Sequence, residues 1–250
     1  MLYSVKFNEK AENSFKQKLK AVTTCYVMAM QPWSFSISFA PVALGNVLSW
    51  REKAQFSFST SVLSTIVVLC VHAASNAVYS NRDKLWRRYK KWPQDSPKAM
   101  VRIGVLFYIM ACIAMLGVMC ISPAKVEHLA MLFFGGLSAS FLYTGGWSQK
   151  SRSALGDLLI IISFGPIAVL FSYVAQCGEF NLKPVLYAIP LALNAEAIFH
   201  SENVKDLEQD EGQGNVTTAT ILGHQVHMKS EETILEKAVK VLIYFVLSFT

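Results

Sequence analysis

The chain has 250 residues, of which 53% are hydrophobic and 16% are charged, and its formal net charge is +6. Soluble globular domains average about 45–50% apolar and about 25% charged residues, so this composition excludes a disordered chain and argues against a water-soluble globule. Long runs lack any Asp, Glu, Lys or Arg: residues 21–50, 54–81, 103–124, 129–149 and 158–178. Each run is long enough to cross a bilayer core, which takes roughly 20 residues, and together they predict a polytopic, all-α membrane protein.

Taken in chain order, the hydrophobic pattern predicts six full membrane spans and a partial one. The first 20 residues contain five lysines and no apolar h-region, so they are expected to form a cytosolic tail rather than a signal peptide. The predicted spans follow at about residues 22–49, 56–79, 102–122, 128–146, 156–177 and 182–199, with the partial helix at 234–250.

The basic residues predict the orientation of these spans. With the N-terminus in the cytosol, 19 of the 23 Lys and Arg residues fall in inner segments, as the positive-inside rule requires. The inner loops are then residues 80–101, 147–155 and 200–233. The basic and aromatic run at residues 84–92 is expected to touch anionic headgroups, with docking of an anionic substrate as a compatible alternative. Because the membrane orientation accounts for the basic residues, the positive net charge does not call for a nucleic-acid partner, and none is expected.

Carboxylates near membrane spans are rare and costly, so each one is a functional candidate. Asp83 follows the second span, Asp157 opens the fifth, and Glu196 lies near the end of the sixth. Farther on, Asp206 and Asp210 are four residues apart and would share one face of a continuing helix. A divalent cation would relieve their repulsion, and Mg²⁺ favours a few carboxylates together with phosphate oxygens. The alternative interpretation is a solvated acidic helix end.

Other polar residues on the inner face carry weaker signals. Lys150, Arg152 and Lys205 lie on the predicted inner side and suit a phosphate group. His72 is expected to be a packing residue inside an apolar span, and the other histidines, His200 among them, show no metal-ligand spacing with acids. The chain has no GxxxxGK[ST], GxSxG or HExxH motif, which leaves nucleotide hydrolysis, serine hydrolysis and zincin chemistry without support.

Several short blocks occur in a fixed order along residues 26–223. They are QPWSFS (31–36), PVALG (41–45), VHAASN (71–76), FGGLS (134–138), FLYTGG (141–146), ALGDL (154–158), FGP (164–166), YAIPLAL (187–193) and the segment 196–210. In this order the blocks resemble the UbiA superfamily of intramembrane prenyltransferases, and within it the animal branch that makes menaquinone. An ordered series of blocks is far more specific than any single motif.

The resemblance implies an all-α bundle of nine membrane helices around a central cavity, of which this chain would supply six or seven in a truncated form. It divides the chain into a cytosolic tail (1–20), a prenyltransferase domain (21–223) and a divergent C-terminal segment with a partial helix (224–250). The implied setting is a multi-pass protein of the endoplasmic reticulum, Golgi or mitochondrial membrane.

The same resemblance implies the reaction and its residues. A geranylgeranyl-like group would pass from its diphosphate to a naphthoquinone or naphthoquinol acceptor, in menaquinone (vitamin K-type) or ubiquinone-type biosynthesis, with Mg²⁺ as cofactor. The implied catalytic residues and Mg²⁺ ligands are Asp83, Asp206 and Asp210. The implied substrate-binding residues are Asn76, Lys150, Asn203 and Lys205. The implied partners are the isoprenyl diphosphate, the quinone-type acceptor, the bilayer and other membrane proteins.

The first acidic motif departs from the family pattern. This branch has N-x-x-x-D followed by a third aspartate. Asn76 and Asp83 match the family pattern. Tyr79, however, stands where the family has its inner asparagine, four residues before Asp83, and the third aspartate has no counterpart. The alternative hypothesis is a catalytically impaired or truncated homologue that binds prenyl diphosphate as a membrane sensor or partner protein. A transporter is the weaker alternative, because the two halves of the chain show no inverted repeat.

Overall fold

The structure, a computed structural model, describes residues 23, 27, 30–53, 56–82, 96–145, 154–205, 207–212 and 219–220. Every regular element in these ranges is a helix, so the predicted all-α class is confirmed. The elements are η1 (Pro32–Ser34), α2 (Phe35–Lys53), α3 (Phe58–Arg82), α5 (Ser96–Ile121), α6 (Val126–Gly145), α7 (Ala154–Ile162), the π-helical turn η3 (Ser163–Ile167), α8 (Ala168–Cys177), α9 (Lys183–Lys205) and α10 (Leu207–Gly212).

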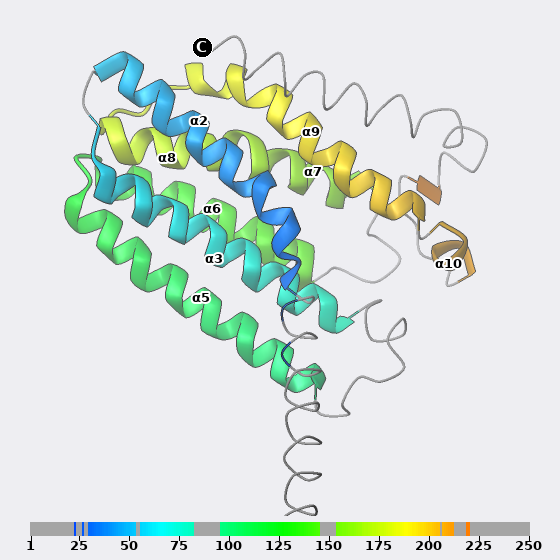
Figure 1. Ribbon diagram of the computed structural model, residues 1–250. Helices are drawn as coiled ribbons and strands as arrows, with labels where there is room; N and C mark the ends of the chain where they lie inside the picture. The colour runs from blue at the N-terminus through cyan, green and yellow to red at the C-terminus, as the bar shows by residue number, and fades with distance from the viewer. Residues whose placement is uncertain are drawn as a thin grey trace, which may run out of the picture.

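The long helices lie side by side in a bundle, with α5 at one edge and α9 at the opposite edge (Figure 1). α3 packs along α5, and α2 packs along α8. The largest buried cluster joins α3, α5, α6 and α8 through residues such as Val67, Met115, Leu132 and Val174. A second cluster joins α2, α8 and α9. These clusters pack the long helices against one another, as in other bundles of packed helices.

The predicted span at residues 22–49 is wrong as a single helix. Gln31 has a left-handed backbone with a φ of 47°, and the short η1 separates it from α2. Pro32 explains the break, because proline lacks an N–H and keeps the preceding residue out of the right-handed helical region. The long helix therefore begins at Phe35.

Two other boundaries also differ from the prediction. α5 begins at Ser96 rather than at residue 102, and α9 continues to Lys205 rather than ending at residue 199. In both cases polar residues extend an apolar helix beyond the bilayer core, and hydropathy does not detect such extensions. The predicted helix at 234–250 and the proposed domain boundaries at 20/21 and 223/224 lie outside the described residues.

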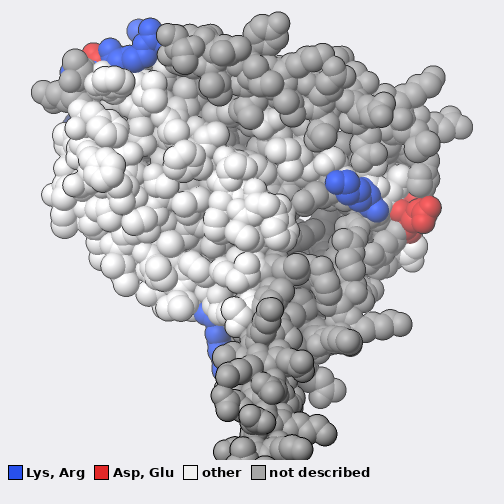
Figure 2. All heavy atoms as spheres, in the orientation of Figure 1, with Lys and Arg blue, Asp and Glu red and all other residues white. Residues whose placement is uncertain are grey.

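Four segments are long and apolar enough to cross a membrane: Phe58–Val78, Lys98–Ile121, Val126–Thr144 and Gly156–Cys177. The last segment combines α7, η3 and α8 into a single candidate span, at the place predicted for residues 156–177. On the face shown in Figure 2, the described surface is almost entirely uncharged and its charged residues lie at the margins. α5 exposes Leu106, Ile113 and Leu116 by 55–64%, which suits contact with lipid. The chain is an integral, multi-pass membrane protein.

The α2–α3 turn meets the α8–α9 turn at one end of the bundle. Lys53 Nζ lies 2.6 Å from Glu179 Oε1, and this hydrogen bond to the carboxylate raises the pKa of Lys53. Gln176 Nε2 donates to the Ser57 carbonyl at 2.9 Å, and the Ser57 N–H donates back to Gln176 Oε1 at 3.1 Å. Both turns belong to the predicted outer face, so these contacts agree with the predicted order of the spans.

Gly45 on α2 lies against the backbone of α8, and we expect Gly45→Ala to destabilise the bundle. A Cβ at this position would overlap Ser172 Oγ and the Val169 carbonyl oxygen, and backbone atoms cannot move aside cheaply. Overpacking of this kind costs about 1–3 kcal/mol, so the melting temperature of the purified protein in detergent should fall. Gly156→Ala is the matched control, because a Cβ at that position would meet nothing within 4 Å. Equal melting temperatures for the two variants would contradict this account of the α2–α8 contact.

Candidate active site

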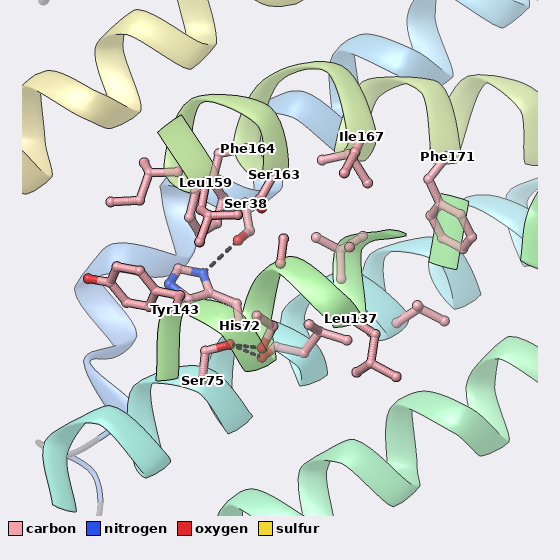
Figure 3. Close-up of a pocket in the computed structure, with 18 of the residues that line it drawn as sticks. Ser38, His72, Ser75, Leu137, Tyr143, Leu159, Ser163, Phe164, Ile167 and Phe171 are labelled. Atoms are coloured by element: carbon pink, nitrogen blue, oxygen red, sulfur yellow. Dashed lines mark hydrogen bonds between the residues drawn. The ribbon is translucent and has the colours of Figure 1, made fainter. Parts of the chain in front are cut away.

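A cavity opens between α2, α3, α6, the α7–η3–α8 span and α9 (Figure 3). It contains about 800 Å³ of empty space, including the volume at its open side. Most of its wall is apolar, including Val67, Val71, Leu137, Ile167 and Phe171. Val67 precedes Asn76, another lining residue, by nine positions on α3, which is about 14 Å along the helix. The cavity is therefore elongated along α3, from an apolar end toward a polar one.

His72 occupies the polar end, held on both ring nitrogens. Ser38 Oγ lies 2.6 Å from Nδ1, and Ser34 Oγ lies 3.2 Å from Nε2. The Ser34 hydroxyl donates its proton to the Gln31 carbonyl at 2.8 Å, so it accepts from His72. This assigns the proton of the neutral ring to Nε2 and leaves Nδ1 to accept from Ser38. The sequence-based view of His72 as a packing residue missed its place in the cavity wall.

Asn76 follows His72 by one helical turn and also lines the cavity. Its Nδ2 donates to the Met30 carbonyl at 3.0 Å and to Ser34 Oγ at 3.1 Å. The break before α2 is what brings the Met30 carbonyl and the Ser34 hydroxyl to this point. Asn76 is thus fixed in orientation on the cavity wall, and its role in substrate binding stays a prediction.

A second group of hydroxyls interrupts the apolar wall between α3 and α6. Ser75 Oγ donates to the Val71 carbonyl at 2.9 Å and contacts Ser140 Oγ. The Tyr108 hydroxyl, from α5, lies 2.6 Å from Ser140 Oγ. Hydroxyls inside an apolar bundle need such partners, because an unpaired one would be costly to bury. Ser75 and Ser140 both line the cavity, so they give it a polar point that an oxygen-bearing ligand can meet.

Asp157, Glu196 and His200 form a third polar group, between α7 and α9. One possible ligand atom from each lies within 4.8 Å of the others, and all three residues are half-buried. Glu196 Oε2 is a buried oxygen without a hydrogen-bond partner among the described residues. The expectation that His200 has no acids at metal-ligand spacing is therefore wrong. The spacing of Glu196 and His200 by four residues was the available signal, since it places both on one helix face.

The other predicted site residues are only partly described. Asn203 is half-buried near the end of α9, and Lys205, the last residue of that helix, is exposed. Asp83, Lys150 and Asp206 lie outside the described residues, as does the side chain of Asp210 on α10. Their roles in catalysis, Mg²⁺ binding and substrate binding stay predictions.

Residues 38–249 match the sequence model of the UbiA prenyltransferase family. The chain is 45% identical over 206 residues to UbiA prenyltransferase domain-containing protein 1 of Gallus gallus, covering 79% of this chain and 62% of that protein. It is 43% identical over 220 residues to the protein of the same name in Homo sapiens, covering 85% and 64%. The chain thus spans somewhat less than two thirds of the length of these relatives.

The fold also matches a solved structure. A UbiA homolog from Archaeoglobus fulgidus, bound to GPP and Mg²⁺, superposes with a TM-score of 0.61 over 90% of this chain and 78% of that one. The two sequences are 16% identical, so this similarity concerns the fold alone.

Proposed function

Because the chain belongs to the UbiA prenyltransferase family, we propose that it is an intramembrane enzyme that moves an isoprenyl group from its diphosphate to an aromatic acceptor. The cavity is the observation that supports this proposal most directly. The wall of the cavity is apolar over most of its length, and His72 and Asn76 lie at its polar end. A prenyl diphosphate has the same pattern, with a long apolar tail and a polar head, so the tail fits the end near Val67 and Phe171.

Mg²⁺ is the proposed cofactor, with Asp206 and Asp210 as ligands and Asp83 completing the site. All three offer carboxylate oxygens, which are the donors that Mg²⁺ prefers beside phosphate. α9 lines the cavity through Phe199 and ends one residue before Asp206, which supports a metal site at the cavity mouth. Bound Mg²⁺ would supply positive charge to the diphosphate as it leaves.

The protein's own residues have separate proposed tasks. Lys150 and Lys205 supply charge to the diphosphate, and Asn76 and Asn203 orient it through hydrogen bonds. The apolar wall keeps water away from the allylic cation that remains after the C–O bond breaks. Exclusion of water matters here, because water would capture the cation before the acceptor ring does.

The proposed acceptor is a naphthoquinone or naphthoquinol-type ring, and the proposed donor carries a geranylgeranyl-like chain, as in menaquinone or ubiquinone-type synthesis. Aromatic side chains support a ring at the polar end: the centroids of Phe164 and Phe199 lie 5.8 Å apart, and those of Tyr143 and Phe199 lie 6.5 Å apart. All three line the cavity. Aromatic faces stabilise both a stacked ring and a nearby cation. The endoplasmic reticulum, Golgi or mitochondrial membrane is the proposed location.

One observation favours a second candidate function. Tyr79 replaces the inner asparagine of the first acidic motif, and that motif lacks its third aspartate. A protein with this change would bind prenyl diphosphate at the remaining acids but turn it over slowly, because two facing metal sites normally stabilise the departing group together. Its role would then be that of a prenyl-diphosphate sensor or partner protein in the membrane.

We expect the purified chain, reconstituted in lipid, to transfer a prenyl group from geranylgeranyl diphosphate to a naphthol acceptor only when Mg²⁺ is present. The measurement is formation of prenylated product with Mg²⁺ and with a chelator. Mg²⁺-dependent binding of the diphosphate without product would favour the second candidate. Absence of both binding and product would contradict both candidates.

A further inference from the structure

We propose that Asp157, Glu196 and His200 bind a transition-metal dication of the Zn²⁺ class, at a site separate from the predicted Mg²⁺ ligands Asp206 and Asp210. The proposal goes beyond prenyl transfer, and its test does not depend on that activity.

The three side chains come from two helices that pack against each other. Asp157 lies in the first turn of α7, and Glu196 and His200 lie one turn apart on α9. Zinc sites repeatedly use two ligands at positions i and i+4 of one helix together with a third ligand from a neighbouring element. The packing of α7 on α9 fixes the third position, so the site depends on the fold and not on a local motif.

The distances leave room for an ion at the centre of the group. The ligand atoms lie within 4.8 Å of one another. Around a tetrahedral Zn²⁺ with bonds of about 2.0–2.1 Å, neighbouring ligand atoms are about 3.4 Å apart. We expect side-chain rotation to close this difference, because carboxylates and imidazoles at half-buried positions can turn about their χ angles. Half-burial also leaves a route for the ion to enter.

Charge and burial both favour a cation here. Two carboxylates face each other at the edge of an apolar bundle, where their repulsion is weakly screened. Glu196 Oε2 is buried without a hydrogen-bond partner among the described residues, and a buried carboxylate oxygen in that state is costly. A dication would satisfy this oxygen and cancel the charge of both acids. A proton shared by the two carboxylates is the competing explanation.

The imidazole decides the class of metal. Mg²⁺ binds oxygen donors and retains water, and it gains little from a histidine nitrogen. Zn²⁺ and its neighbours accept imidazole and carboxylate together. The His200 nitrogen therefore distinguishes this group from the all-oxygen set predicted at Asp206 and Asp210.

The test uses the purified full chain in detergent, stripped of metal and titrated with Co²⁺, whose visible absorption reports nitrogen and oxygen ligands. We expect one Co²⁺ per chain with a histidine-type spectrum that excess Mg²⁺ does not remove. His200→Gln and Glu196→Gln should each weaken binding by about 100-fold or more, since even indirect partners of a metal are worth 10–100-fold. Asp206→Asn is the matched control and should leave both spectrum and affinity unchanged.

Three outcomes would overturn the proposal. The first is absence of Co²⁺ binding, which would favour the shared proton. The second is an unchanged Co²⁺ spectrum in His200→Gln. The third is loss of the spectrum in Asp206→Asn, which would place the metal at the predicted Mg²⁺ site. Melting temperatures recorded without metal show whether each variant is folded. If His200→Gln does not fold, the same comparison is made with Glu196→Gln, whose side chain has nearly the same size.

Discussion

Replacing Asp206 with Asn is expected to lower Mg²⁺-dependent prenyl transfer by about 10²–10³-fold, the usual cost of losing one group that stabilises charge in a transition state. The substitution removes one ligand charge and hardly changes the size of the side chain. It should also weaken Mg²⁺-dependent binding of geranylgeranyl diphosphate more than binding of geranylgeraniol, because only the diphosphate engages the metal. The two measurements are product formation at saturating Mg²⁺ and equilibrium binding of each ligand.

Glu208→Gln provides the matched control for this prediction. Glu208 lies on α10, two residues after Asp206, and its side chain is exposed. The change removes the same charge from the same acidic segment, so a general electrostatic effect would lower transfer in both variants. A loss confined to Asp206→Asn would locate the effect at the metal. Equal losses in the two variants, or equal weakening of both ligands, would contradict the role proposed for Asp206.

The membrane class and most spans could be predicted from the sequence, because bilayer thickness imposes a length on each apolar run. The interruption before α2 could not be placed by hydropathy. Residues 21–50 contain no charge, so the run reads as one span, yet Pro32 and the left-handed Gln31 divide it. The division has a structural purpose, since it directs Ser34 toward His72 and Asn76.

The polar groups inside the bundle were harder to predict, because each joins residues far apart in the chain. Asn76 could be singled out from its place in a recognisable block. The group of Asp157 and His200 could not, since 43 positions separate them and only the packing of α7 on α9 brings them together. Single-sequence patterns report neighbours along one helix, such as Glu196 and His200, and do not report contacts between helices.

Replacing Leu137 with Trp should shorten the cavity and select against long prenyl chains. Leu137 lines the apolar part of the cavity on α6, away from His72 at the polar end (Figure 3). The larger ring would occupy space that the far end of a geranylgeranyl chain needs, whereas a five-carbon dimethylallyl chain would remain near the polar end. Overpacking costs about 1–3 kcal/mol, which corresponds to about 5–150-fold in affinity. Binding of geranylgeranyl diphosphate should weaken by this factor relative to binding of dimethylallyl diphosphate.

The same substitution at Leu142 separates this steric effect from a general effect of tryptophan. Leu142 lies on α6 and is 48% exposed on the outside of the bundle, where an indole contacts lipid instead of substrate. Leu142→Trp should therefore change the affinities for long and short diphosphates equally, if at all. The measurement is the ratio of the two dissociation constants in each variant, which cancels differences in the amount of folded protein. An unchanged ratio in Leu137→Trp would mean that the prenyl chain does not extend past this residue, and the tail would then have to leave the cavity between helices into the lipid.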